Sequence, residues 1–183
     1  MAFRYCIRFS GAGGQGLIQA ARILAEAAAI YDNMNAAESC SYGPEARGSA
    51  SRAEIIISDE AIDHPKADKI DLLMVLTQEA FDKNIDDVVA NGTVVADSGI
   101  ETSEKTADRQ LFVVPFKEIA EQECSRPGMV NIVVLGFFAA VSDVVNRKSI
   151  RQAILARVPK MSEQLYICAY DAGLRAAEAR GAV

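Results

Sequence analysis

The feature that most constrains the fold is a cluster of glycines between a predicted strand and a predicted helix. Gly11, Gly13 and Gly16 fit the pattern G-x-G-x-x-G, directly after a segment, residues 3–9, in which apolar and polar residues alternate. Glycines let the backbone turn tightly and let a ligand approach it closely. Free N–H groups at the start of the following helix favour an anion. The cluster therefore predicts a strand–turn–helix unit of an α/β fold, whose glycines serve either an anion site or tight packing of the turn.

Further strands and helices are predicted to alternate along the rest of the chain. Strands are expected over residues 35–40, 52–58, 72–76, 93–96 and 111–114, and helices over residues 17–30, 78–90, 115–123, 131–145, 149–156 and 161–180. Short buried strands that alternate with helices are typical of a mainly parallel sheet covered by helices. We therefore expect a single three-layer α/β domain over residues 1–183, with a Rossmann-like glycine-rich first strand–helix turn.

Composition excludes several classes of protein. The chain of 183 residues has 19 basic and 25 acidic side chains, a net charge of −6, which disfavours a general nucleic-acid binder. Its four cysteines form no CxxC pair and it has one histidine, His64, which argues against a zinc site or an iron–sulfur cluster held by this chain alone. We find no signal peptide and no apolar run of about 20 residues. We therefore expect a cytoplasmic chain, bound to no membrane, with reduced thiols.

One predicted helix, residues 131–145, is apolar nearly all round. Such a helix is either the central buried helix of the domain or a surface that faces a partner subunit. Asn131 begins it, and is expected to be an N-terminal cap or a buried hydrogen-bonding anchor.

A dinucleotide site would need an acidic residue about 20 positions after the glycines, at the end of the second strand. Asp32 lies before that predicted strand and Glu38 lies inside it. A free-standing NAD(P)- or FAD-binding oxidoreductase domain therefore stays open as the alternative, as does a non-catalytic nucleotide-binding regulator. Asp97, at the end of a predicted strand, is a further candidate either for a site or for capping the turn that follows.

A second loop is predicted over residues 41–48, which read Ser-Tyr-Gly-Pro-Glu-Ala-Arg-Gly. The Gly-Pro pair stops regular structure. It leaves a rigid polar surface with one aromatic side chain, Tyr42, and one guanidinium, Arg47. The alternative is a solvated turn with an internal pair between Glu45 and Arg47.

The two loops, residues 11–16 and 41–48, strongly resemble those of the gamma subunit of 2-oxoacid:ferredoxin (acceptor) oxidoreductases, which act on pyruvate, ketoisovalerate or 2-oxoglutarate. The resemblance covers almost the whole chain and makes residues 1–183 a single gamma-type domain. One departure is Ser49, where the family usually repeats glycine. Further matching residues are Ile57-Ser58-Asp59, Ile62, Pro65, Val95-Ala96-Asp97, Asn131 and Leu135-Gly136.

The resemblance implies the chemistry of a whole complex. Such enzymes oxidatively decarboxylate a 2-oxoacid to an acyl-CoA and pass electrons to ferredoxin or flavodoxin. Thiamine diphosphate lies between the alpha and beta subunits, and iron–sulfur clusters lie in the beta subunit and a ferredoxin-like subunit. The gamma chain packs on the thiamine-binding subunits and helps to form the coenzyme A site. It is inactive alone, and when isolated it could pair with a second copy.

The resemblance also suggests the substrate and the site residues. 2-Oxoglutarate is slightly preferred, because of the sequence of the second loop. No catalytic residue and no metal ligand is expected in this chain. The residues expected to contact coenzyme A are Gly11, Gly13, Gly14, Gln15, Gly16, Ser41, Tyr42, Gly43, Arg47 and Asn131.

Overall fold

The computed structural model, which describes residues 3–42, 50–102 and 104–181, is built on a six-stranded sheet of order β2-β3-β1-β4-β5-β6. The pairs β1–β4, β4–β5 and β5–β6 are parallel, whereas β3 is antiparallel to both β1 and β2. The strands are β1 Arg4–Ala12, β2 Asn35–Tyr42, β3 Ala50–Ser58, β4 Ile70–Val75, β5 Val88–Asp97 and β6 Gln110–Val114.

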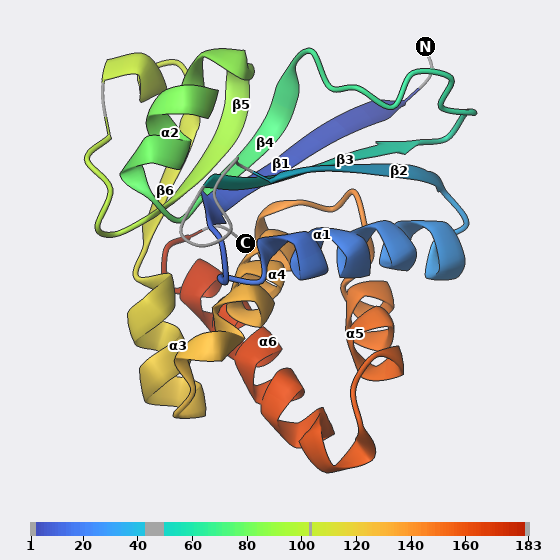
Figure 1. Ribbon diagram of the computed structural model, residues 1–183, viewed down its shortest axis with the longest axis vertical. Helices are drawn as coiled ribbons and strands as arrows, with labels where there is room; N and C mark the ends of the chain where they lie inside the picture. Colours follow the sequence, from blue (N-terminus) through green and yellow to red (C-terminus); the bar gives the residue numbers. More distant parts are fainter. Residues whose placement is uncertain (1–2, 43–49, 103, 182–183) are drawn as a thin grey trace.

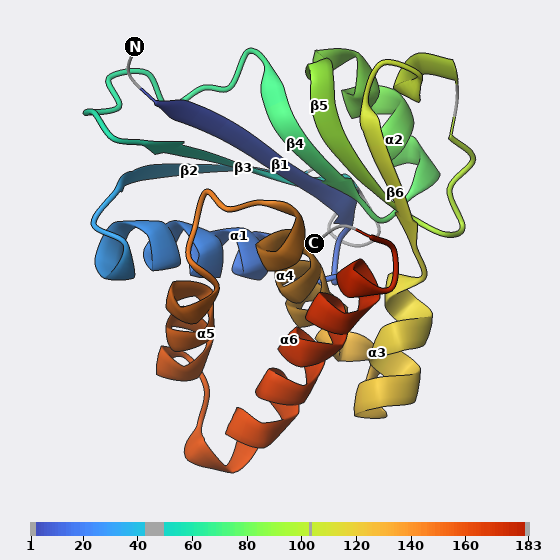
Figure 2. The ribbon, with the colours of Figure 1, turned by 180° about the vertical axis from the view of Figure 1, so that it is seen from behind.

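Helices cover both faces of the sheet unequally. Figures 1 and 2 show α2 on one face of the sheet, where it packs against β1 and β4, and the five other helices on the opposite face. The helices are α1 Leu17–Glu26, α2 Gln78–Asn84, α3 Phe116–Cys124, α4 Val130–Val141, α5 Arg147–Ala156 and α6 Glu163–Glu178. The predicted α/β domain with a mainly parallel sheet is therefore confirmed.

Several predicted boundaries differ from the structure: the helix predicted over residues 131–145, for example, ends at Val141. Strand pairing explains two further differences. The helix predicted over residues 78–90 ends at Asn84, and β5 begins already at Val88, which pairs with Ile70 of β4. The loop predicted to begin at Ser41 begins later, since Ser41 and Tyr42 extend β2 opposite residues of β3. In both places the neighbouring strand supplies hydrogen-bond partners that local propensity does not foresee.

A buried polar network fixes β1 on the face that α2 covers. Arg8 is 2% exposed and binds Glu54 of β3 at 2.6 Å, Asp87 at 2.5 Å and the Asn84 side-chain oxygen at 3.0 Å. The guanidinium thus links β1 to β3 and to the end of α2. Because a buried charge is stable only when paired, the network holds the strand that leads into the glycine loop.

Helix α4 is the buried centre of the larger helical layer. Every residue from Val130 to Ala140 is buried. The Phe138 ring meets Phe9 of β1 edge-on, with centroids 6.1 Å apart, and Phe137 meets Phe112 and Phe116 in the same way. Of the two interpretations of this apolar helix, the buried one is confirmed. No single helix among the described residues is long and apolar enough to cross a membrane; the one pair of helices with enough apolar length is bent by 120°.

Helices α4 and α6 cross at two glycines that leave no room for a side chain. A Cβ on Gly136 would lie 2.0 Å from the carbonyl oxygen of Tyr170, and one on Gly173 would lie 2.1 Å from the carbonyl oxygen of Val133. Both clashes are with backbone atoms, which cannot swing aside as side chains do. The close approach of these helices therefore depends on both glycines.

We expect Gly136→Ala to destabilise the chain, although alanine favours a helix over glycine by about 1 kcal/mol. Overpacking of a core costs roughly 1–3 kcal/mol, and a clash with backbone lies at the upper end of that range. Urea denaturation of the purified chain measures the loss. Gly128→Ala is the matched control, because nothing lies within 4 Å of a Cβ at that position. Equal stability of the two variants would contradict the tight crossing.

Candidate functional site

The glycine loop turns the chain from β1 into α1. Gly14 and Gly16 have φ of +91° and +74°, in the left-handed region that favours glycine. The Gln15 side-chain oxygen accepts a hydrogen bond from the backbone N–H of Ala12 at 2.7 Å, which closes the turn on itself. The loop conformation is thus set by its own residues.

The glycines of the predicted loop have different structural roles. A Cβ on Gly11 would lie 2.3 Å from the Gln15 side-chain oxygen and 2.9 Å from the Leu17 side chain, so a larger residue here would displace the oxygen that closes the turn. Gly14 is exposed, and a Cβ there would meet nothing within 4 Å. The loop therefore combines a packed base with a backbone surface that a ligand can reach.

Asn131 supports this loop from behind. Its side chain is 4% exposed and its Nδ2 donates to the carbonyl oxygen of Gly16 at 3.4 Å. A Cβ on Gly16 would lie 2.8 Å from the same nitrogen. Asn131 lies within α4, one residue after its start, so the interpretation as a buried anchor is confirmed and the one as an N-cap is wrong.

A cavity of about 380 Å³ opens beside the glycine loop. It is lined by Gly13, Gly14, Gly16, Leu17, Ile18, Gln19, Arg22, Ser51 and Arg157. Sequence reasoning missed Ser51, Arg22 and Arg157 as residues of this site. Arg22 lies on the same helix as the loop's exit and could have been found from helical spacing. Arg157 follows α5, and nothing in the sequence connects it with the glycines.

The two arginines of the cavity each have a carboxylate neighbour. Arg157 binds both carboxylate oxygens of Glu26, one of them at 2.5 Å from its Nε, and this hydrogen bonding lowers the pKa of Glu26. The Nε of Arg22 lies 3.5 Å from Glu38 of β2. The guanidinium groups are thus held in place along the cavity by α1 and β2.

Strand pairing places the start of the second predicted loop at the same end of the strands as the glycine loop. Gly11 of β1 pairs with Ser51 of β3, and Ser51 pairs with Tyr42 of β2. The backbones of Gly11 and Tyr42 therefore lie two strand spacings apart, about 10 Å. Ser41, next to Tyr42, is exposed. Gly43 and Arg47, the other predicted residues of this loop, lie outside the described residues.

The topology argues against a dinucleotide site. Such a site needs an acidic residue at the end of a parallel strand next to β1. On one side of β1 the antiparallel strand β3 separates it from β2, whose Glu38 is paired with Arg22. On the other side the parallel strand β4 ends at Val75 and is followed by the uncharged residues Leu76 and Thr77. Asp32 accepts a hydrogen bond from the backbone N–H of Asn146 at 2.7 Å and so anchors the start of α5.

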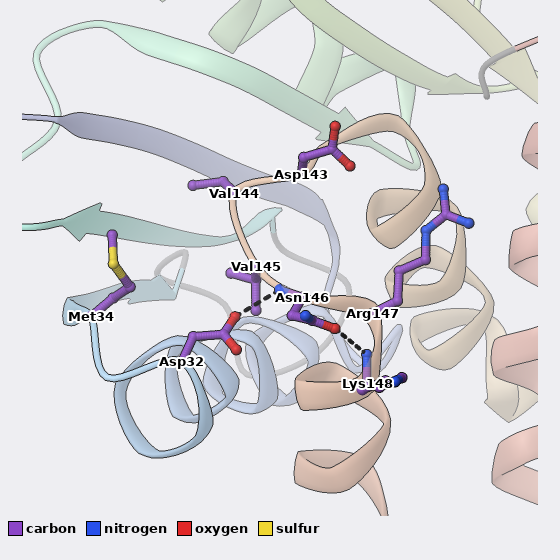
Figure 3. Close-up of a pocket in the computed structure, with 8 residues that line it drawn as sticks. All are labelled: Asp32, Met34, Asp143, Val144, Val145, Asn146, Arg147 and Lys148. Carbon is purple, nitrogen blue, oxygen red and sulfur yellow. Dashed lines mark hydrogen bonds between the residues drawn. The ribbon is translucent and has the colours of Figure 1, made fainter.

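A second cavity, of about 570 Å³, lies where the chain passes from α1 to β2 and from α4 to α5 (Figure 3). It is lined by Asp32, Met34, Asp143, Val144, Val145, Asn146, Arg147 and Lys148. The dashed contacts of Figure 3 are those of a helix start: Asp32 with the Asn146 backbone, and the Asn146 side chain with the Lys148 backbone. Of the residues weighed as site candidates from the sequence, Asp32 lies in this cavity, but none of those expected to contact coenzyme A does.

Asp97 fulfils the capping role at the end of β5. Its Oδ1 accepts a hydrogen bond from the backbone N–H of Gly99 at 3.3 Å, while its Oδ2 is buried without a partner among the described residues. Within the same part of the chain, no three side chains of His, Cys, Asp or Glu converge to hold a metal ion.

Fold and site together define an α/β domain with a glycine-rich turn between β1 and α1 and a cavity beside that turn. A family model described as pyruvate ferredoxin/flavodoxin oxidoreductase matches residues 6–179. The chain belongs to this family. Its similarity to a solved gamma subunit places it among the gamma subunits of the 2-oxoacid:ferredoxin oxidoreductases.

Similar proteins agree with this assignment over the whole domain. 2-Oxoglutarate synthase subunit KorC of Methanocaldococcus jannaschii is 44% identical, over 94% of this chain and 93% of that protein. The solved keto/oxoacid ferredoxin oxidoreductase gamma subunit of Geobacter sulfurreducens is 42% identical, with a TM-score of 0.88 over 97% of this chain and 98% of that one. A 2-oxoglutarate:ferredoxin oxidoreductase from Magnetococcus marinus shares the fold, with a TM-score of 0.87 and 20% identity, over 96% of this chain and 31% of that chain.

We expect Gly16→Ala to lower the free energy of unfolding by about 2–4 kcal/mol, because it adds left-handed strain to a clash with Asn131. Chemical denaturation of Gly16→Ala, Asn131→Ala and the double variant measures the coupling. Since Asn131→Ala removes the clashing amide, the double variant should be more stable than the sum of the single effects by about 1 kcal/mol or more. If the two changes in the free energy of unfolding are strictly additive, the glycine loop and α4 are not in steric contact at these positions.

Proposed function

We propose that the chain serves a complex that oxidatively decarboxylates 2-oxoglutarate to its acyl-CoA and passes the electrons to ferredoxin or flavodoxin. The observation that carries the choice of substrate is the 44% identity to a protein named 2-oxoglutarate synthase subunit KorC, over almost the full length of both chains. Relatives named for ketoisovalerate or pyruvate are less similar, at 30–33% identity.

The role of this chain in the proposed complex is to form part of the coenzyme A site. Coenzyme A carries several phosphates, and backbone N–H groups at a glycine turn before a helix suit such anions. Three observations support the proposal: the open backbone at Gly14, the cavity beside it, and the position of Tyr42 two strands from Gly11. Arg47, in the second loop predicted from the sequence, is proposed as a further phosphate or carboxylate contact.

The redox and thiamine chemistry is assigned to partner subunits. The described residues hold no convergent set of metal-binding side chains. Thiamine diphosphate and the iron–sulfur clusters would then belong to the thiamine-binding alpha and beta subunits and to a ferredoxin-like subunit. The chemistry of such reactions is that of the cofactors, so this chain binds and positions.

We expect the purified chain alone to show no turnover of any 2-oxoacid with coenzyme A. The complex reconstituted with this chain should reduce ferredoxin in the presence of 2-oxoglutarate and coenzyme A, and co-purification from the native source identifies the partners. Acyl-CoA formation by the chain alone would contradict the assignment of the thiamine and redox chemistry to partner subunits. A preference of the complex for pyruvate or a branched-chain oxoacid would refute only the substrate.

We expect Gly14→Val to raise the KM for coenzyme A of the reconstituted complex by about tenfold, the effect of roughly 1.4 kcal/mol. The added side chain would cover the backbone N–H groups that an anion needs. Gly181→Val is a matched control, because Gly181 also has a positive φ, of 65°, with nothing within 4 Å, and lies after α6. Both variants carry similar backbone strain, so an equal KM in the two would show that the loop is structural.

A further inference from the structure

Two of the four cysteines lie side by side between α3 and α6. Cys124 is the last residue of α3, and Cys168 lies in the middle of α6. The Cys168 sulfur contacts the carbonyl oxygen of Glu123 at 3.4 Å, and the peptide bond of that carbonyl leads directly into Cys124. Cys168 also contributes to the raised pKa of the Cys124 thiol, after burial. The pair comes from segments far apart in the sequence and is formed only by the fold.

Contacts between α3 and α6 surround the two thiols. Arg175, two turns after Cys168 on α6, binds the Glu123 carboxylate at 2.8 Å. Ser125, with φ of 52°, ends α3 directly after Cys124. Cys124 is buried against the main core and Cys168 packs against it at the core's edge, partly exposed. One thiol is therefore reachable from outside and the other is placed to react with it.

We propose that Cys124 and Cys168 are a dithiol site that a peroxide oxidises to an intramolecular disulfide between α3 and α6. The Cys168 thiolate attacks hydrogen peroxide, which gives a sulfenic acid at Cys168 and releases one water. The Cys124 sulfur then attacks the sulfenic sulfur, the S–S bond forms, and a second water leaves. In sum, two thiols lose two electrons and two protons, and one peroxide becomes two waters. A dithiol reductant reverses the step through a mixed disulfide.

The order of the two steps follows from exposure. Cys168 is the partly exposed thiol, so peroxide reaches it first. Burial, followed by the neighbouring Cys168, raises the pKa of the Cys124 thiol to about 11. Since the thiolate is the attacking form, the second step should be slow at neutral pH and faster as the pH rises toward 9.

The bond would constrain the helical layer behind the glycine loop. It closes the segment between residues 124 and 168, which contains α4 and α5. Asn131, the anchor of Gly16, lies on α4 only seven residues after Cys124 (131 − 124). A cross-link restricts the unfolded chain, so the oxidised protein should melt at a higher temperature than the reduced one.

The test is carried out on the full chain, reduced and then treated with hydrogen peroxide at pH 7 and pH 9. After digestion without reductant, mass spectrometry should find a peptide that joins Cys124 to Cys168. The intact mass should fall by two hydrogen atoms, the melting temperature should rise, and dithiothreitol should restore both. The linked peptide should form faster at pH 9.

Serine variants separate this site from the other thiols. Cys124→Ser and Cys168→Ser should each abolish the linked peptide and the rise in melting temperature. Cys6→Ser and Cys40→Ser should abolish neither, because these cysteines lie on β1 and β2 with β3 between them. The proposal is overturned if Cys124 stays fully alkylatable after peroxide treatment, if Cys168 is oxidised beyond the sulfenic acid without a link, or if the only disulfides join separate chains.

Discussion

Helix α4 has to be enclosed on all sides, and the rest of the domain is arranged around that requirement. Its aromatic side chains meet β1, β6 and α3, and α6 can cover its remaining side only because Gly136 and Gly173 let the two backbones approach. A helix with no polar face leaves water only when other elements cover it completely. The buried helix thereby fixes where α3 and α6 lie, and with them the pair of thiols between these helices.

The same helix connects the core to the glycine loop. Asn131 is the one buried polar side chain that α4 places against that loop, and it takes up the space that any side chain at Gly16 would need. From the other side, β3 inserts between β1 and β2 and brings Ser51 beside Gly11. The proposed coenzyme site is thus supported by a helix on one side and by an antiparallel strand on the other.

Much of this arrangement was predictable from the sequence. The strand of alternating residues, the glycine cluster and the apolar helix each occur where local patterns place them, because each is encoded by neighbours in the chain. The end of α2 and the length of β2 could not be predicted, because both depend on hydrogen bonds between strands that are distant in the sequence. Arg157 was missed for the same reason: it reaches the cavity from the end of α5.

The sequence by itself determined the α/β class, the glycine turn, the apolar character of α4 and, through its two loops, the resemblance to the gamma subunits. These are properties of short segments, set by side-chain size, polarity and backbone freedom. Only the tertiary structure decided that β3 separates β1 from β2, which removes the dinucleotide arrangement, and that Cys168 lies beside the end of α3 that carries Cys124. Contacts between distant segments arise when apolar surfaces are buried together, and no local pattern records which surfaces will meet.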